Sequence, residues 1–203
     1  GINTGRAREM SAQTSGTGII NFSSEGNNKK KKGYGVFARN YTSPSDVTVT
    51  QSSGTIEGNT TGIHVYNKGA SSSTKIIQTA GEIIGKNDDG IFAHNDINTS
   101  KNIEIIQGAN GKVTGKDNGI YANNKGLGST TIQTAGDVNG SDFVGIWAMN
   151  YGNTTDVTIT QTSGTITGQT TGIYTVNHGS GVIAIAQSAG SITGRSVDGI
   201  YAI

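Results

Sequence analysis

Apolar and polar residues alternate along this chain in short runs that recur at a regular spacing. Around Gln161, for example, alternating runs occupy residues 157–160, 165–167 and 172–176, and Gly, Asn and Ser separate them. Such alternation is typical of β-strands whose two sides meet different environments. The chain shows no 3.6-residue period of an amphipathic helix. The pattern therefore predicts three short strands in each repeat and an all-β protein.

The repeat is marked by a glutamine and, further on, by a glycine. The glutamines are Gln13, Gln51, Gln78, Gln107, Gln133, Gln161 and Gln187, and the glycines are Gly35, Gly62, Gly90, Gly119, Gly145, Gly172 and Gly199. A unit of this size cannot bury its own apolar side, so it must stack on its neighbours. Three strands and about 27 residues per turn predict a parallel β-helix, a three-sided solenoid of about seven coils.

Positions counted from each glycine predict which side chains face inward. The next residue is Ile in six of the seven units and Val in the first, and the residue two further on is small or β-branched. These two positions share one side of a strand, which we assign to the core. Five residues after the glycine stands an asparagine, at Asn40, Asn67, Asn95, Asn124, Asn150 and Asn177. We expect an internal ladder of these amides between coils; ligand binding is the alternative. The direction of the glutamine side chains stays open.

The position between the two core positions points outward and is aromatic in six of seven units. Its residues are Phe37, His64, Phe92, Tyr121, Trp147, Tyr174 and Tyr201. Stacked from coil to coil, they predict a continuous external stripe. Two interpretations stay open: the rings stabilise the sheet by stacking on one another, or they form a surface for a partner.

The first unit is longer than the others, because Gln13 and Gly35 are 22 residues apart where other units use 11 or 12. We expect a solvated basic loop insertion at about residues 22–33, which includes Lys29, Lys30, Lys31 and Lys32. Together with Arg6, Arg8 and Arg39, these lysines give residues 1–40 a net charge of +5, against −4 for the rest. This basic end predicts contact with an acidic receptor surface or a sulfated glycosaminoglycan; a purely solubilising charge run is the alternative.

Composition supports a thin fold and excludes several classes of protein. The chain has 203 residues, 32 of them Gly, with 32% hydrophobic and 14% charged residues, one Pro and no Cys. A low apolar fraction suits a narrow core, and the lack of Cys excludes disulfides and thiolate metal sites. No apolar run is long enough for a membrane-spanning helix. We expect a capping segment at residues 1–12 and the β-helix at residues 13–203, and we expect further coils beyond the last residue.

Candidate catalytic residues do not assemble into a site by spacing. Asp88 and Asp89 faintly resemble a polygalacturonase motif, but His178 is expected three coils away. The acidic residues Glu57, Glu82 and Asp137 fall in different columns or distant coils, as do the histidines His64, His94 and His178. Nucleotide-binding and nucleophile-elbow motifs are absent. We therefore expect no catalytic residues, no metal and no cofactor.

The recurring Gly-Ile-Tyr-Ala and Gln-Thr-Ser-Gly-Thr-Ile-Thr-Gly units, together with the absence of Cys, resemble the passenger domains of Gram-negative autotransporters. The resemblance covers residues 13–203. It implies a right-handed, single-stranded parallel β-helix, export through the periplasm to the cell surface or the medium, and a C-terminal translocator barrel that this chain lacks. The Gly-Asp-Ser-Gly segment of the serine-protease passengers does not occur.

Within this class, the asparagine- and lysine-rich coils are similar to proangiogenic autotransporters of Bartonella. That resemblance implies a secreted, monomeric virulence factor that acts on endothelial cells through a vascular endothelial growth factor receptor. Its partner is then a host cell-surface receptor or heparan sulfate, and not a nucleic acid. Two alternatives stay open: a surface-retained adhesin that acts through the faces of the β-helix, and a polysaccharide-degrading enzyme.

Overall fold

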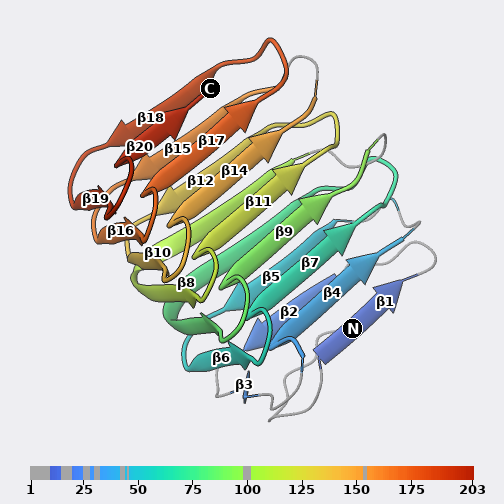
Figure 1. Ribbon diagram of the computed structural model, residues 1–203. Coiled ribbons are helices and arrows are strands. Elements are labelled where there is room, and N and C mark those ends of the chain that lie inside the picture. The colour runs from blue at the N-terminus through green and yellow to red at the C-terminus, as the bar shows by residue number, and fades with distance from the viewer. Residues whose placement is uncertain are drawn as a thin grey trace.

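The structure, a computed structural model, is built from strands and the turns between them. It describes residues 10–14, 20–24, 28–29, 33–41, 44, 46–97, 102–152 and 155–203, and only the backbone in the first three of these ranges. In this part of the chain there is no helix, and hence none long and apolar enough to cross a membrane. The strands stack in the order of the sequence, from β1 at one end to β20 at the other (Figure 1).

Three faces of parallel strands form the walls of the stack. Face 1 contains β1 (Met10–Thr14), β4 (Val36–Asn40), β7 (Ile63–Asn67), β9 (Ile91–Asn95), β11 (Ile120–Asn124), β14 (Ile146–Asn150), β17 (Ile173–Asn177) and β20 (Ile200–Ala202). Face 2 contains β2 (Ile20–Ser24), β5 (Val47–Gln51), β12 (Thr130–Thr134), β15 (Val157–Gln161) and β18 (Ile183–Gln187). Face 3 contains β3 (Asn28–Lys29), β6 (Thr55–Gly58), β13 (Asp137–Gly140), β16 (Thr165–Gly168) and β19 (Ser191–Gly194).

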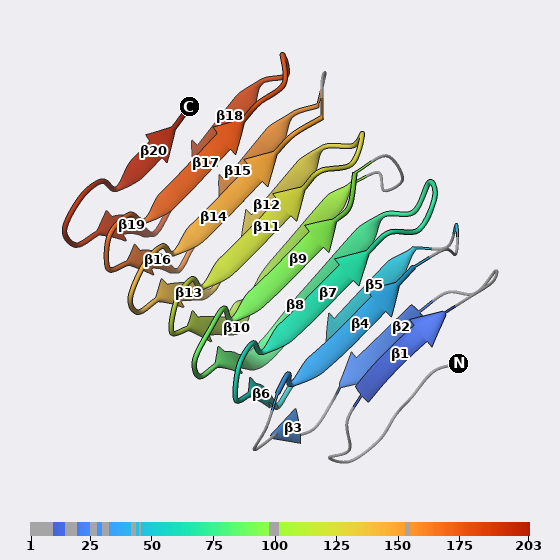
Figure 2. The ribbon, with the colours of Figure 1, turned by 45° about the vertical axis from the view of Figure 1, so that its right-hand side comes forward.

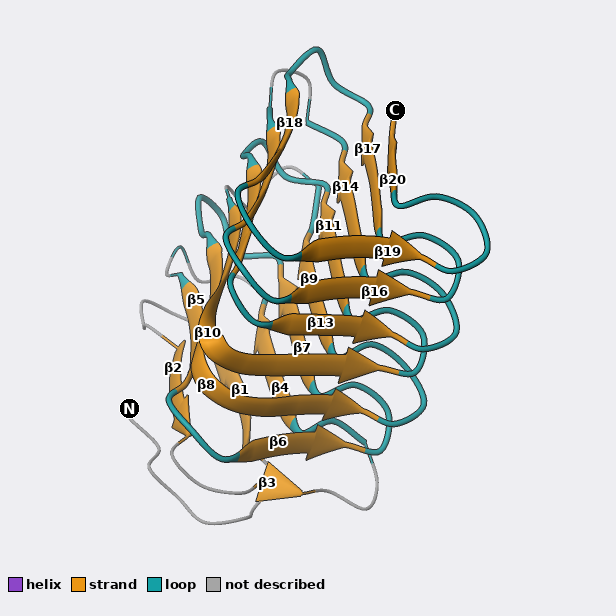
Figure 3. Ribbon diagram, turned by 90° about the vertical axis from the view of Figure 1, so that its left-hand side faces the viewer, coloured by secondary structure: helices purple, strands orange, loops and turns teal. Residues whose placement is uncertain are grey.

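Two long strands join face 2 to face 3. The first half of β8 (Thr74–Gly85) pairs with β5 and its second half pairs with β6, and β10 (Ile103–Gly115) pairs in the same way with β12 and β13. Both bend around the corner between the two faces (Figure 3). The chain therefore visits the three faces in turn, seven times, and then adds β20 to face 1 (Figure 2). This arrangement confirms the predicted parallel β-helix of three strands per coil.

The core is a narrow column of β-branched and small side chains. Strands of face 1 pair in register, so that Ile63, Ile91 and Ile120 stack directly on one another. Each of these three side chains is at most 1% exposed. Alternate residues of the strands point inward, as the burial of every second residue in β4, β5 and β7 shows. The predicted core positions of face 1 are therefore confirmed from β4 to β17, whereas in β20 the predicted core residue Ile200 is 45% exposed.

The recurrence of a glycine in each coil has a steric cause at the corner between face 3 and face 1. A Cβ atom on Gly62 would lie 2.6 Å from the carbonyl oxygen of Gly90 and 2.6 Å from Cγ2 of Ile83. The corner of one coil thus touches the backbone of the next, and there is no room for a side chain. The equivalent glycines of the other inner coils, Gly35, Gly90, Gly119, Gly145 and Gly172, meet the same contacts at 2.6 to 2.8 Å.

The structure of the first coil contradicts the predicted insertion of a basic loop. Strand β1 pairs with β4 on face 1 and places Gln13 beside Arg39, whereas Ser24 of β2 is the residue in register with Gln51. Gln13 therefore does not belong to the glutamine column, and the ten-residue insertion inferred from it is wrong. Residues 22–24 and 28–29 lie in strands of the stack, paired with β5 and β6, and residues 10–12, expected in the capping segment, already belong to strand β1 of face 1.

The glutamine column also differs at one coil. Gln51, Gln78, Gln107 and Gln161 point inward and are at most 3% exposed, but Gln133 is exposed and Thr134 takes the column position. The cause is the alternation of side chains along a strand: Ile132 points inward, so Gln133, which directly follows it, points outward. In the other five coils the glutamine lies two residues after an inward-facing Ile or Val; the fifth of these, Gln187 in the last coil, is in register with Gln161 but exposed.

Candidate interaction surface

A ladder of rings runs along the outer side of face 1. It consists of Phe37, His64, Phe92, Tyr121, Trp147, Tyr174 and Tyr201, which we call the aromatic ladder, and these residues are in register from coil to coil. The centroids of neighbouring rings are 4.6 to 5.4 Å apart. These are the separations of interacting aromatic pairs, each contributing about 0.5–1.5 kcal/mol beyond area burial. Stacking between coils is therefore one role of the ladder.

A second outward row lies beside the ladder, and an edge row follows it where the chain leaves face 1. The second row contains Arg39, Tyr66, His94, Asn123, Met149 and Val176, and the edge row contains Tyr41, Lys68, Asp96, Lys125, Tyr151 and His178. We call the ladder and these two rows together the aromatic face. Ten of the twelve Phe, Tyr and Trp residues of the chain and all three histidines belong to it or stack on it.

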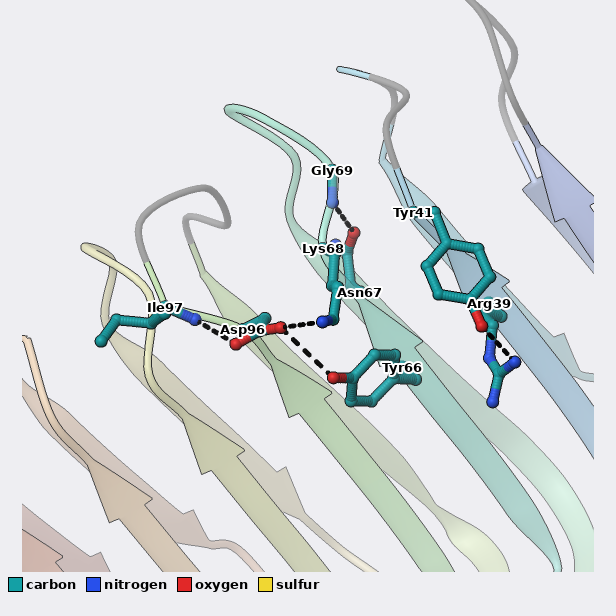
Figure 4. Close-up of polar contacts among 8 residues, drawn as sticks. All are labelled: Arg39, Tyr41, Tyr66, Asn67, Lys68, Gly69, Asp96 and Ile97. Carbon is teal, nitrogen blue, oxygen red and sulfur yellow. Dashed lines mark hydrogen bonds and ion pairs between the residues drawn. The ribbon is translucent and has the colours of Figure 1, made fainter.

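Cations on this face lie against rings. The Arg39 guanidinium is 4.8 Å from the centroid of Phe37 and 5.0 Å from that of Tyr41, whose hydroxyl accepts a hydrogen bond from it (Figure 4). Lys125 Nζ lies 5.8 Å from the centroid of Tyr151. Each cation–π contact contributes about 0.5–1 kcal/mol at an exposed site, so both charges are held in place.

The one carboxylate of the aromatic face is fully engaged. Asp96 Oδ2 lies 2.9 Å from Lys68 Nζ and accepts a hydrogen bond from the Tyr66 hydroxyl at 3.2 Å, while Oδ1 accepts one from the backbone N–H of Ile97 (Figure 4). The hydrogen bond to Asp96 raises the pKa of Lys68. Asp96 thus neutralises the charge of Lys68. The other two cations, Arg39 and Lys125, give the aromatic face a net positive charge.

The histidines of the ladder and second row behave as aromatic residues. His64 stacks between Phe37 and Phe92, and burial lowers its pKa to about 4. His94 stacks on Tyr66 with ring centroids 4.9 Å apart, and burial lowers its pKa as well. Both rings are therefore neutral at pH 7 and add no charge to the face.

A small notch opens at the border of face 1, where the chain arrives from face 3. It has a volume of about 290 Å³ and is lined by Phe143, Val144, Trp147, Thr170, Thr171 and Tyr174. Phe143 is 50% exposed, and Trp147 is the only tryptophan of the chain. We call this hollow the aromatic notch. Sequence periodicity does not indicate it, because Phe143 lies in a corner outside the strands.

The predicted asparagine column is in register, and all its members except the half-buried Asn177 are buried. Asn40, Asn67, Asn95, Asn124 and Asn150 are 0% exposed, and Asn40 Nδ2 donates to Asn67 Oδ1 at 3.1 Å. The side-chain oxygens also accept backbone N–H groups two residues later in the chain, from Gly69 to Asn67, from Gly126 to Asn124 and from Gly179 to Asn177. These bonds fix the turns that leave face 1, as expected for Asx turns.

The basic residues proposed as a contact surface are only partly described. Lys29 contributes its backbone to β3, Arg39 lies on the aromatic face, and Arg6, Arg8, Lys30, Lys31 and Lys32 lie outside the described residues. The contact between this cluster and an acidic partner therefore stays a prediction.

The candidate catalytic residues occupy other structural positions. Asp88 accepts a hydrogen bond from the Thr61 hydroxyl in the corner before β9, whereas His178 stacks on Tyr151 at the far end of β17. The remaining acidic candidates are engaged elsewhere, Glu57 by Lys86, Glu82 by Lys112 and Asp137 by Thr165. Among the described residues, no three His, Cys, Asp or Glu side chains gather closely enough to hold a metal ion.

One polar column escaped the sequence analysis. A short polar residue precedes β5, β8, β10, β12 and β15, and its side-chain oxygen accepts the backbone N–H of the corresponding residue in the next coil. The acceptors are Asp46, Ser73, Asn102, Ser129 and Asp156, at 2.7 to 3.4 Å from Ser73, Asn102, Ser129, Asp156 and Val182. The recurrence of Asp, Ser or Asn before these strands was the available signal.

We compared the chain with protein families, curated proteins and solved structures, and no family model, curated protein or solved structure matches it.

Proposed function

We propose that this protein is a non-catalytic binding protein that contacts host cells through its aromatic face, as a secreted or surface-exposed passenger domain. The observation that carries the proposal is the concentration of Tyr, Trp, Phe, Met and Arg on one of three otherwise similar faces. These residue types are enriched at protein interfaces, where Lys and Glu are depleted. Structural stacking alone does not require Tyr151, Met149 or Phe143, which lie outside the ladder.

The outward residues of face 2 provide the contrast. Thr48, Thr50, Thr131, Thr158 and Thr160 point outward there, together with Ile77, Ile106 and the ion pair between Lys75 and Glu104, whose charged atoms are 2.8 Å apart. Face 3 carries ion pairs between Lys86 and Glu57 and between Lys112 and Glu82. Among the described side chains, neither face carries an outward aromatic residue, and the aromatic face stands apart from both in this respect.

The aromatic face is also well prepared for binding. Side chains that are already fixed by their neighbours lose little conformational entropy when a partner docks. The ladder rings are held on both sides by the adjacent coils, and Arg39 and Lys125 are held on rings. A partner would therefore meet a rigid surface. The resemblance to proangiogenic passengers makes endothelial cells, and a vascular endothelial growth factor receptor on them, the first partner to test.

A second candidate contact is the basic end of the chain. Its support is the position of Arg39 on the aromatic face, which brings at least one member of the basic cluster to the same surface. Replacing Lys29, Lys30, Lys31 and Lys32 by Ser should weaken cell binding at physiological salt if this end contacts heparan sulfate or an acidic receptor. Unchanged binding would exclude the lysines as a contact.

Binding of the labelled protein to endothelial cells tests the leading proposal. The double variant Phe143→Ser, Tyr174→Ser should bind at least about tenfold more weakly than the original protein, because aromatic anchors dominate interface energies. The matched control is Ile77→Ser, Ile106→Ser, which removes two outward apolar side chains that lie in register on face 2. Circular dichroism verifies that each variant is folded. Equal loss of binding in both double variants would contradict the proposal.

A further inference from the structure

The aromatic notch has the size and lining of a pocket for a single large side chain. Its volume of about 290 Å³ lies just below the range of small-molecule pockets, which begins at about 300 Å³. The lining includes three aromatic residues, and one of them, Phe143, is 50% exposed. An exposed Phe beside a hollow is the arrangement in which an apolar anchor of a partner protein is buried at an interface.

Apolar side chains lead away from the notch along the strands. Trp147 and Tyr174 border it, Met149 and Val176 come next, and the edge row follows with Tyr151 and His178 stacked at 4.5 Å. Outward residues of a strand are about 6.6 Å apart. The path from residue 147 to residue 151 therefore spans about 13 Å, the length of about four residues of an extended chain.

The two ends of this path differ in charge. At the notch, the corner carries the carboxylates of Asp117 and Asp142 in neighbouring coils. The pKa of Asp117 is raised by its burial and by the proximity of Asp88 and Asp142, which outweigh the opposite effect of the exposed Lys116 in the same corner. At the opposite end, the exposed Lys125 lies over the ring of Tyr151. A bound segment therefore meets negative charge beside the notch and positive charge about four residues further on.

We infer that this half of the aromatic face binds an extended segment of a partner protein that places a large apolar side chain in the notch and a carboxylate over Lys125. The same charges set the order of side chains along the path, because basic or neutral residues are favoured next to the anchor and acidic residues at the far end. The inference rests on the proposed function of the aromatic face and adds the chemistry of the partner to it.

Selection from a random library of twelve-residue peptides displayed on phage, with the full chain immobilised, tests this pattern. The selected peptides should share a Leu, Phe, Met or Trp separated by about four residues from an Asp or Glu. Selected peptides without this pattern, or no enrichment above an uncoated surface, would overturn the inference.

A synthetic version of the most enriched peptide then locates the contact. Trp147 is the only tryptophan, so its fluorescence reports on the notch directly when the peptide lacks Trp. Phe143→Ser should weaken the affinity at least about tenfold and Lys125→Gln about threefold, with the effect of Lys125→Gln disappearing at high salt. The matched control is Lys112→Gln, which removes the same charge from face 3 and should change nothing.

The outcomes separate this inference from the proposed function. Loss of cell binding in Phe143→Ser, Tyr174→Ser without any selected peptide pattern would leave the aromatic face as the contact surface and overturn the peptide inference. Binding of a heparin oligosaccharide that depends on Lys125 and Phe143, in place of peptides, would overturn it as well. A peptide that binds the notch while the double variant still binds cells would support the inference and contradict the proposed function.

Discussion

The buried carboxyl group of Asp89 accepts two hydrogen bonds from Asn118 of the next coil, at 2.8 Å from its Nδ2 atom and at 3.2 Å from its backbone nitrogen. Asp89 is only 3% exposed, and burial raises its pKa to about 7, against a usual value of 3.8. The nearby charge of Asp88 acts in the same direction, and the bonds from Asn118 oppose it. Two neighbouring coils are thus joined through a carboxyl group that titrates near neutral pH.

This pKa predicts a pH-dependent stability. Between pH 3.8 and about 7 the folded protein keeps a proton on Asp89 that the unfolded chain has lost, so the contribution of Asp89 to stability falls as the pH rises through this range. The variant Asp89→Asn keeps an acceptor for Asn118 and removes the titration. Urea unfolding should show that the stability of the variant relative to the original protein rises from pH 4 to pH 7, by roughly 4 kcal/mol at most. A difference that is constant across this range would contradict the assignment.

The lowered pKa of His64 predicts the opposite pH dependence of stability. Burial lowers its pKa from 6.5 to about 4, so between these values the unfolded chain takes up a proton that the folded protein does not. The contribution of His64 to stability is present above pH 6.5 and is lost as the pH falls towards 4. Replacing His64 by Phe, the residue in register on both sides, should remove this loss. Urea unfolding should show that the unfolding free energy of the variant relative to that of the original protein increases by on the order of 2 kcal/mol when the pH is lowered from 7 to 4.5. A parallel decline in both proteins would exclude His64 as its source.

The glycine column offers a matched pair of substitutions. A Cβ atom on Gly119 would lie 2.6 Å from the Gly145 carbonyl oxygen and 2.6 Å from Val138 Cγ1, whereas on Gly199 the nearest atom would be 3.5 Å away. Gly119→Ala should therefore destabilise the protein by about 1–3 kcal/mol, as overpacking does, and Gly199→Ala by much less. Thermal unfolding of the two variants gives the comparison. Similar losses in stability would show that close approach between coils is not the reason for the column.

Two glutamines test the corrected register. Gln78 Nε2 lies within hydrogen-bonding distance of Gln51 Oε1, the Gly81 carbonyl and the Lys112 carbonyl, at 2.9 to 3.1 Å, while Gln133 is exposed. Gln78→Ala should cost about 1–3 kcal/mol of unfolding free energy, because it leaves buried acceptors without a donor. Gln133→Ala should change stability by no more than about 0.5 kcal/mol. An equal cost at both positions would contradict the register.

The strand columns could be predicted from the sequence because a parallel stack places like residues on like residues. The repetition of Ile at positions 63, 91 and 120 is therefore enough to predict one inward position. The same logic failed in the first coil, where Ser24 replaces the expected glutamine and the short strand β3 leaves no periodic signal. There the run from Lys29 to Lys32 predicts a solvated loop, whereas the backbone of Lys29 lies in strand β3.

The candidate site, too, could be predicted only in part from the sequence. The aromatic ladder was predicted residue by residue, since strand parity decides which side chains point outward. The aromatic notch was not, because it joins Phe143 and Thr170 from the corners of successive coils to Trp147 and Tyr174 of the strands. Corner residues follow no two-residue period, and their approach to a strand depends on how the chain turns.

Photo-crosslinking on host cells tests the central claim, that the aromatic face, together with the aromatic notch at its border, is the surface that meets the partner. A photoreactive phenylalanine analogue replaces Phe143 at the notch in one variant and Ile106 on the outside of face 2 in the other. After illumination of endothelial cells carrying each variant, the account predicts a crosslinked cell-surface protein from position 143 and none from position 106. Crosslinking from position 106 alone would contradict it.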